Sequence, residues 1–378
     1  MKSSEFEVYT RRDIEIVSGT GARVKDSRGR EYIDCIGGIG VASLGHGNRI
    51  LAHALKQQAE KIISVSNHFY NDKRTELAEK LTGLAPDSLN RVFFCNSGTE
   101  SIEAAIKFAR YATKKHGFVC AERSFHGRTM GALSATFKEK YREPFKPLVP
   151  GFDFAEYNNF ESFKSKINQD TAAVIIELVQ GEGGIYPADK TFIKNLSMFC
   201  RENNILIIID EVQTGVGRTG TFFTFEQYGI VPDIVTLAKG LGGGVPIGAV
   251  LVSDKIPGMP GRHGSTFGGN PFSCAAAVTV IDYIKKESLI KKVSEKGDRF
   301  VSLIKKNNLS AIKEIRHLGL MIGVELFGDA SEAVNKMQEM GVLAITAGEN
   351  TIRFLPPLVI EYADLEKVAQ VLTEVLRF

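Results

Sequence analysis

The stretch Ile205-Leu-Ile-Ile-Ile209, followed directly by Asp210 and Glu211, decides the fold. An apolar run without alternation is typical of a strand that is buried on both faces. Amphipathic helical patterns, such as residues 102–109, separate it from further apolar runs at 91–95, 172–177, 234–237 and 247–252. Strands that alternate with helices predict a mostly parallel sheet covered by helices. We therefore expect an α/β domain over residues 41–275.

The pattern changes after Pro271. Long helix-like stretches at 275–286 and 289–306 precede short strands around 318–326 and 351–354, and a last helix begins at Tyr362. This order predicts a smaller α+β domain over residues 276–378. An N-terminal segment, residues 1–40, contains an expected hairpin over Arg23–Ile33 that turns at 27–29, and we expect it to pack with the small domain.

Composition excludes several classes of protein. The 378 residues are 43% hydrophobic and 24% charged, which is typical of a globular protein of two domains and excludes disordered, collagen-like and coiled-coil chains. A net charge of +3 with interleaved signs predicts no nucleic-acid arm and no membrane patch. The five scattered cysteines and the spacing of the seven histidines predict neither disulfides nor a metal site. With no apolar leader or membrane span, we expect a cytoplasmic protein.

The stretch Ser97-Gly98-Thr99-Glu100 lies between an expected strand and an expected helix. Backbone N–H groups at a helix N-terminus attract anions, so a phosphate would fit there. The same four residues also match an ordinary capping box, with Ser97 as the cap and Glu100 three residues later. Taken alone, the stretch leaves both interpretations open.

Two further side chains stand where ligands of α/β sheets bind. Asp210 ends the most apolar strand, and Lys239 ends the next expected strand 29 positions later, before a run rich in glycine. Singly, Asp210 would cap a turn and Lys239 would be a surface lysine. Together with an anion site they match the needs of pyridoxal phosphate (PLP), which requires a lysine for its Schiff base, an acid for its pyridine nitrogen and a phosphate cup.

Three isolated charges lie in apolar or glycine-rich surroundings. They are Arg128, Arg353 and Glu182. Arginines so placed suit bidentate binding of a carboxylate, and structural ion pairs are the alternative interpretation of each.

The combined motifs resemble the class III, omega-amino acid branch of the fold type I aminotransferases. The similarity covers nearly the whole chain. It is carried by Glu31–Asp34, Leu44–His46, Asn96–Glu100, Phe125–Thr129, Gln180–Gly184, Asp210–Gly215, Gly217–Gly220, Pro232–Asp233, Lys239–Gly240, Ser265–Pro271 and Ile352–Pro357. The resemblance implies a fold type I PLP-dependent transferase with a mostly parallel seven-stranded sheet.

The resemblance also implies roles at matching positions. Lys239 would form the Schiff base with PLP, Asp210 would pair with the pyridine nitrogen, and Gln213 would bind the phenolic oxygen. Phe125 and Val212 would cover the two faces of the ring. The implied cofactor-binding residues are Ser97, Gly98, Thr99, Phe125, His126, Asp210, Val212, Gln213, Lys239 and Thr266. Because the family's equivalent of Thr266 reaches the neighbouring subunit's phosphate, the resemblance implies a homodimer with shared sites.

For the substrates, the resemblance implies that Arg128 binds the carboxylate remote from the reacting carbon. Arg353 would bind the α-carboxylate of glutamate, and Glu182 would mask Arg353 while the omega-amine is bound. Expected substrate contacts are Arg128, Glu182, Ser265, Arg353, Ile39 and Tyr70. The reaction would transfer a terminal amino group to 2-oxoglutarate, leaving a semialdehyde and glutamate.

Ile39 bears on the amino donor. Family members that act on free ornithine carry a tyrosine seven residues before the histidine of the Gly-His pair, and this chain has Ile39 there. Because an apolar residue would leave a free ammonium unpaired, we expect an α-N-blocked ornithine or lysine. The chain thus resembles the acetylornithine aminotransferase group of arginine biosynthesis. It also resembles relatives in lysine or arginine biosynthesis that act on substrates linked to an acidic amino-group carrier protein of the LysW type.

Several alternatives stay open from the sequence. A cluster of basic residues would dock such a carrier or form a solvated face; it comprises Lys138, Lys140, Arg142 and Lys146. A 4-aminobutyrate aminotransferase would share the cofactor residues. A glutamate-1-semialdehyde aminomutase would not need the pair of Arg353 and Glu182, and a non-catalytic binding protein would not need Lys239.

Overall fold

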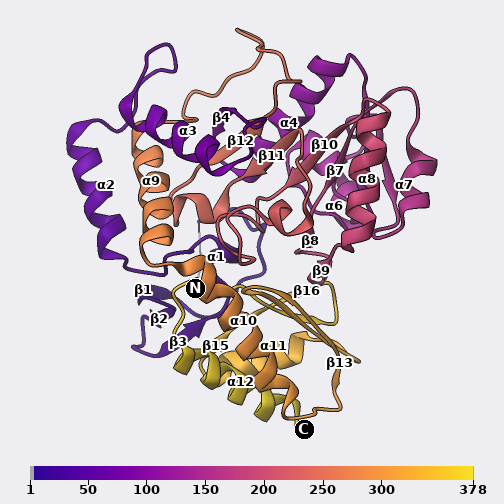
Figure 1. Cartoon of the computed structure of the whole chain (residues 1–378). Helices are drawn as coiled ribbons and strands as arrows, with labels where there is room; N and C mark the ends of the chain where they lie inside the picture. The colour runs from indigo at the N-terminus through magenta and orange to yellow at the C-terminus, as the bar shows by residue number, and fades with distance from the viewer. Residues whose placement is uncertain (1–3, 378) are drawn as a thin grey trace.

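The computed structural model describes residues 4–377, and Figure 1 shows their arrangement. Residues 1–3 of the expected N-terminal segment and residue 378 of the expected C-terminal domain lie outside the described residues. A seven-stranded sheet crosses the upper part of the molecule in the order β4-β12-β11-β10-β7-β5-β6. Its strands are β4 Arg91–Cys95, β5 Gly117–Ala121, β6 Phe152–Ala155, β7 Thr171–Ile176, β10 Leu206–Asp210, β11 Ile234–Leu237 and β12 Gly248–Val252.

This sheet is mostly parallel, which confirms the expected fold class. Strand β10 runs parallel to both β7 and β11, and β5 runs parallel to β6 and β7. Strand β12 is antiparallel to its two neighbours, β11 and β4. The carboxyl ends of β7, β10 and β11 therefore meet at one edge, where Glu177, Asp210 and Lys239 follow.

Helices cover both faces of the sheet, and this explains the unbroken apolar runs. Leu206 and Ile208 pack with the side chains of α4 (Gly98–Thr113) in one apolar cluster. Ile207 and Ile209 point to the opposite face and share a second cluster with residues of α8 (Lys190–Glu202). Because successive side chains of a strand alternate between faces, a strand covered on both sides needs apolar residues at every position.

The lower part of the molecule in Figure 1 holds two smaller sheets. One is antiparallel, in the order β13-β14-β17-β16, and carries Arg353 on β17. Its strands are β13 Ile312–Leu318, β14 Met321–Leu326, β16 Ile345–Ala347 and β17 Thr351–Phe354. The other joins the N-terminal hairpin to a late strand, with β1 Ile16–Thr20, β2 Arg23–Asp26, β3 Glu31–Asp34 and β15 Val342–Leu343. A short hairpin, β8 Val179–Gln180 with β9 Tyr186–Pro187, encloses the loop that carries Glu182.

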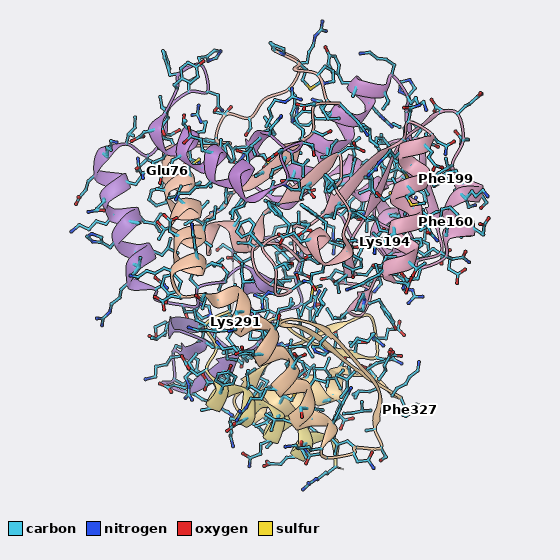
Figure 2. All side chains as sticks on the ribbon, in the orientation of Figure 1. Glu76, Phe160, Lys194, Phe199, Lys291 and Phe327 are labelled. Carbon is cyan, nitrogen blue, oxygen red and sulfur yellow. The ribbon has the colours of Figure 1, made fainter. Side chains whose placement is uncertain are left out.

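The remaining helices surround these sheets. Helices α2 and α3 both pack on α9, and α10 packs on α12. Helix α7 meets α8 through an edge-to-face pair of Phe160 and Phe199, which Figure 2 labels, with ring centroids 5.7 Å apart. The helices not yet bounded are α1 Gly37–Gly40, α2 Arg49–Lys61, α3 Asp72–Leu84, α5 Met130–Ser134, α6 Glu139–Arg142, α7 Phe160–Lys166, α9 Pro271–Lys286, α10 Leu289–Lys305, α11 Ser331–Glu339 and α12 Tyr362–Leu376, with short 3₁₀ turns η1 Glu143–Phe145, η2 Thr224–Tyr228 and η3 Lys239–Gly242.

Some boundaries of strands and helices that were predicted from the sequence were wrong. The expected strand region at 318–326 contains a reversal at Gly319, where φ is +56°, so Leu318 ends β13 and Met321 begins β14. Helix α9 starts at Pro271 rather than at residue 275, because Asn270 caps it by accepting a bond from the Ser273 N–H. Between residues 4 and 377 no helix has the length and apolar character that crossing a bilayer requires.

Candidate active site

A cavity of about 580 Å³ opens where the carboxyl ends of the central strands meet the N-terminus of α4. Its lining includes Asp210, Val212, Gln213 and Lys239, together with Ser97, Gly98, Thr99, Phe125, His126, Arg128 and Glu182. The structure thus gathers in one place most of the residues that the sequence singled out. A cavity of this volume is typical of a small-molecule site.

The N-terminus of α4 forms one wall. Ser97 caps the helix by accepting a bond from the Glu100 N–H at 3.3 Å, so the capping interpretation of this stretch is correct. The anion interpretation is compatible with it, because Ser97, Gly98 and Thr99 also line the cavity. Gly98 leaves no room for a side chain, since a Cβ there would lie 2.5 Å from Cγ1 of Val212.

Asp210 is held at the floor of the cavity by three hydrogen bonds. Its Oδ2 lies 2.7 Å from Nδ1 of His126, and its Oδ1 accepts bonds from the Val212 N–H and the Thr236 hydroxyl. Burial by itself would lower the pKa of His126, but the hydrogen bond and charge of Asp210, with the charge of Glu177, raise it above the usual value. The raised pKa shifts the protonation equilibrium of His126 toward the imidazolium, whose charge would offset part of the cost of burying the Asp210 carboxylate.

Sequence reasoning missed Glu177, which lines the same cavity. Its carboxylate accepts the Phe125 N–H at 3.0 Å and the Gly181 N–H at 3.4 Å. Burial raises the pKa of Glu177 to about 7, against the lowering effect of His126. The available signal was an acid at the end of a buried strand, the same signal that identified Asp210 on the neighbouring strand. Asn96 and Tyr9 also line the cavity and were not singled out.

Lys239 begins the turn η3 directly after β11, in a left-handed conformation with φ of +43°. Burial lowers the pKa of Lys239, and the nearby charge of Arg353 lowers it further, while Asp210, Glu182 and Glu177 act in the opposite direction. A lysine whose ammonium form is destabilised has a larger fraction of neutral amine, the form that attacks a carbonyl.

Arg353 lies behind Glu182, away from the open part of the cavity. The Arg353 side chain is 2% exposed, and its Nη1 forms an ion pair with Oε1 of Glu182 at 2.7 Å. Its Nε has no hydrogen-bond partner among residues 4–377. The expected pairing of these two charges is therefore present, and it covers a guanidinium that still has an unused donor.

Arg128 occupies the other side of the cavity and is exposed. Its guanidinium stacks on the ring of Tyr141, with the carbon 3.7 Å from the centroid, and lies 5.5 Å from that of Phe125. These aromatic contacts fix its orientation without neutralising its charge. Arg128 thus presents a cation to anything negative that enters.

Five expected site residues lie outside this lining: Arg353, which is covered by Glu182, and the four described next. Tyr70 is fully exposed, and Ile39 is 44% exposed, although the Ile39 carbonyl accepts a bond from Nε2 of Gln213. Ser265 and Thr266 line a separate cavity of about 820 Å³, and the Ser265 hydroxyl accepts bonds from Nδ2 of Asn96 and from the Gly268 N–H. The structure of one chain does not bring Tyr70 or Thr266 to the floor where Asp210 and Lys239 lie.

Two of the four residues of the basic cluster, Arg142 and Lys146, are paired with acids of the same segment. Lys146 contacts both Glu139 and Glu143, and Arg142 pairs with Glu139 at 3.4 Å and stacks on Phe154. These pairs reduce the positive field that a docking surface for an acidic protein would need.

Comparisons with known proteins decide the family. The sequence model described as Aminotransferase class-III matches residues 8–376. The chain belongs to the class-III aminotransferases. It is 46% identical over 373 residues to an acetylornithine aminotransferase of Archaeoglobus fulgidus, covering 98% of both chains. It is also 43% identical over 380 residues to an acetylornithine aminotransferase of Bacillus cereus, covering 100% of this chain and 98% of that one.

Solved structures agree with the fold and the cofactor. An ornithine aminotransferase of Toxoplasma gondii superposes with a TM-score of 0.94 at 31% identity, covering 99% of this chain and 92% of that one. An amine transaminase of an uncultivated Pseudomonas species, in its PLP-bound form, gives 0.94 at 25% identity, with 100% and 99% covered. The chain is therefore a fold type I, PLP-dependent aminotransferase, which acts on an amino donor and a 2-oxo acid.

The cavity fits this cofactor by its own geometry. The helix N-terminus at Gly98, the carboxylate of Asp210 and the amine of Lys239 offer an anion site, a partner for a protonated ring nitrogen and a nucleophile. Phe125 and Val212 line the same cavity and supply apolar side chains that could cover a flat ring. His126 Nε2 is buried without a partner among residues 4–377.

Proposed function

We propose that this enzyme transfers the terminal amino group of N2-acetylornithine to 2-oxoglutarate, as a step of arginine biosynthesis. The observation that carries the proposal is the ion pair of Glu182 with Arg353, in a cavity that Arg128 also lines without an ion pair to any residue from 4 to 377. One arginine is permanently available to a carboxylate, and the other becomes available only when Glu182 moves. The relatives named above as acetylornithine aminotransferases support the same substrate.

The residues at the floor would hold PLP. Ser97, Gly98 and Thr99 would bind its phosphate, Asp210 would keep its ring nitrogen protonated, and Gln213 would bind its phenolic oxygen. Phe125 and Val212 would enclose the ring. When bound, PLP supplies an aldehyde that takes up an amino group and a ring that stabilises negative charge at the substrate carbon.

Lys239 would carry the proton that the transfer requires. Its amine, neutral in a larger fraction because its pKa is lowered, accepts a proton from the substrate carbon and returns it to a neighbouring atom. The position of Lys239 at a strand end directs its Nζ into the cavity. His126 would fix the orientation of Asp210, to which its Nδ1 is bonded.

The two arginines would distinguish the two substrates by charge. Acetylornithine brings one carboxylate, which Arg128 would bind, and Glu182 then stays on Arg353. Glutamate and 2-oxoglutarate bring a second carboxylate, which cannot approach Arg353 while Glu182 neutralises it. Glu182 must therefore leave Arg353 when either dicarboxylate binds.

The choice of an acylated donor depends on Ile39. Ile39 is partly exposed beside Gln213 and offers no acceptor from its side chain to a free α-ammonium. A substrate whose α-nitrogen is acylated carries no charge there, so it avoids this cost. A lysine or ornithine linked to an acidic carrier is the second candidate, but the internal ion pairs of Lys146 and Arg142 give it less support.

A homodimer is part of the proposal. Thr266 and Tyr70 lie away from the floor of their own chain, and the segments that carry them expose Phe69, Tyr70 and Phe267. Exposed aromatic residues at this density favour a protein interface, and a second copy would complete its neighbour's site with Thr266. The five buried, unpaired cysteines are compatible with the reducing cytoplasm that we propose for the enzyme.

The direct test follows one half-reaction on the PLP-loaded enzyme. N2-acetylornithine, free ornithine, 4-aminobutyrate and a carrier-linked lysine are mixed with it separately, and loss of the cofactor's visible absorbance is timed. We expect acetylornithine to react fastest, with free ornithine at least about tenfold slower because of its unpaired ammonium. Equal rates with 4-aminobutyrate, or a strong preference for the carrier-linked substrate, would contradict the proposal.

A further inference from the structure

A second cavity adjoins the catalytic one at Glu182. This side cavity, of about 660 Å³, is lined by residues that include Arg123, Phe125, Lys138, Tyr141, Glu182 and Tyr186. Glu182 and Phe125 line both cavities, so the carboxylate stands at the boundary between them. A carboxylate that leaves Arg353 therefore has open space on its other side.

Arg123 lies at the point where Glu182 would enter this space. A Cβ built on Gly183 would lie 3.1 Å from Cβ of Arg123, so the Arg123 side chain starts beside the residue next to Glu182. Consecutive Cα atoms are about 3.8 Å apart, and the long side chains of arginine and glutamate easily span such a separation. The two charges can meet without a change in the backbone.

Arg123 has a free charge in the present arrangement. It is exposed, and its guanidinium carbon lies 4.8 Å from the ring centroid of Tyr186. Among residues 4–377 no carboxylate forms an ion pair with it. Two of the acids that line the side cavity have other partners, because Glu325 pairs with Arg316 and Lys313, and Glu139 pairs with Lys146. A third, Glu349, lines the same cavity and forms no ion pair with any residue from 4 to 377.

The backbone of the loop that carries Glu182 is fixed from two directions. Arg316, on β13, donates to the Gly184 carbonyl at 2.9 Å through Nη2 and to the Ile185 carbonyl at 3.2 Å through Nε. Gln180, at the start of the loop, donates from its Nε2 to the Glu122 carbonyl at 2.6 Å. These bonds hold both ends of the loop, so rotation of the Glu182 side chain is the simplest way for its carboxylate to move.

We propose that Arg123 is the second partner of Glu182, receiving its carboxylate in the side cavity whenever a dicarboxylate occupies Arg353. This inference rests on the proposed function, in which Glu182 must leave Arg353. Glu182 then exchanges one arginine for another, and its charge is compensated in both positions. Arg123 acts as a specificity-determining residue, because it stabilises only the state that accepts glutamate or 2-oxoglutarate.

The test measures binding of glutarate, a dicarboxylate that can neither give nor take an amino group, to the PLP-loaded enzyme by calorimetry. We expect Arg123→Gln to weaken glutarate binding about two- to fivefold, the range of a partly exposed ion pair. Arg123→Lys should restore part of the loss. The control Lys194→Gln removes the same charge from the exposed face of α8 (Figure 2), and it should leave glutarate binding unchanged.

Kinetics and a double variant complete the test. In Arg123→Gln, KM for 2-oxoglutarate should rise by a similar factor, while KM for acetylornithine stays within about twofold, since that substrate binds with Glu182 on Arg353. In a Glu182→Gln background, Arg123→Gln should no longer matter, because the charge that it receives is gone.

The outcomes separate the two claims. Unchanged glutarate binding in Arg123→Gln, or an equal loss in the Glu182→Gln background, overturns the role of Arg123. If Glu182→Gln itself leaves glutarate binding unchanged, the masking of Arg353 in the proposed function is what fails.

Discussion

The floor and the rim of the catalytic cavity are built differently. The floor consists of His126, Glu177, Asp210 and Lys239, which follow β10 and its neighbours or contact residues that do. We use the term rim for Tyr70 and Thr266, which come from loops and lie outside the lining of this cavity in the single chain. His126, Glu177 and Asp210 of the floor are buried, and His126 is hydrogen-bonded to Asp210, whereas Tyr70 is fully exposed.

One chain brings its own floor residues together, whereas it does not bring its rim residues to that floor. The floor residues stand at strand ends of a rigid sheet, which holds them in position before any ligand binds. Cofactor binding therefore has to order few of these side chains. The rim residues have no such support, and we propose that a second copy gives them their function. Substitutions in the floor should therefore have larger effects than substitutions in the rim, and only the effects of rim substitutions should depend on the partner chain.

The largest effect is expected at the floor, with Lys239→Ala. Loss of the amine should abolish transamination, because no other described residue offers a nucleophile and a proton carrier at that position. Reduction with borohydride followed by mass spectrometry should attach PLP to the wild-type chain and not to the variant. Lys239→Arg, which keeps the charge, should be equally inactive, and full turnover in either variant would contradict the assignment of Lys239.

A smaller loss is expected for Asp210→Asn. The amide can no longer hold a protonated ring nitrogen or a protonated His126, so kcat should fall about 10²- to 10³-fold. Titration of His126 by nuclear magnetic resonance should show a lower pKa, since the charge that raises it is gone. Asp254→Asn, at an exposed carboxylate beside β12, serves as the control and should leave both quantities unchanged.

The rim variant Thr266→Ala should weaken PLP binding about tenfold, the effect of one lost hydrogen bond to a charged group. Coexpression with Lys239→Ala supplies the sharper test. A mixed dimer would hold one site with both an intact Lys239 and an intact Thr266, so activity at limiting PLP should exceed that of Thr266→Ala alone. If activity instead falls only in proportion to the amount of the inactive chain, Thr266 does not act in the site of the partner.

The smallest effect is expected from the substitution Glu325→Gln, which removes a carboxylate that pairs with Arg316. Burial would raise the pKa of Glu325, but hydrogen bonds from Lys313, Arg316 and Tyr186 outweigh it and lower the pKa to about 2. A lowered folded-state pKa means that this stabilisation is present above pH 4.5, the ordinary value, and is lost as pH falls toward 2.

The measurement is the free energy of unfolding of Glu325→Gln and wild type between pH 6 and pH 3. The gap between the two proteins should narrow as pH falls. A matched variant, Glu366→Gln, removes the carboxylate of an exposed pair with Arg299 and should cost less than about 1 kcal/mol. A constant gap for Glu325 across this range would show that its ion pairs do not stabilise the fold.

The sequence allowed the floor to be predicted more fully than the rest of the site. Asp210 and Lys239 were found because unbroken apolar runs locate buried strands, and strand ends locate the site. Strands β5 and β6 were not predicted, since charged residues flank β5 on both sides and Asp153 interrupts the apolar run of β6. The reversal at Gly319 was also missed, because two adjacent apolar strands read as one run.

Contacts between segments that are distant in the chain could not be predicted from the sequence. Arg316 holds the loop of Glu182 across 132 positions of chain, and no local pattern signals such a bond. The side cavity is lined by segments that lie far apart in the chain, such as Tyr141 and Thr346 of β16. The assignment of Thr266 to a second chain came from family resemblance and stays a prediction, since one chain has no partner to contact.

The tight contact between Gly98 and Val212 bears on how this enzyme can acquire new substrates. Any side chain at position 98 would have to displace Val212, so the floor resists change by single mutations. Ile39 and Tyr70 are exposed in the single chain, so a change of either side chain displaces no tightly packed neighbour within that chain. Directed evolution toward bulkier amines should therefore accumulate its mutations around the entrance and leave the cofactor cradle as it stands.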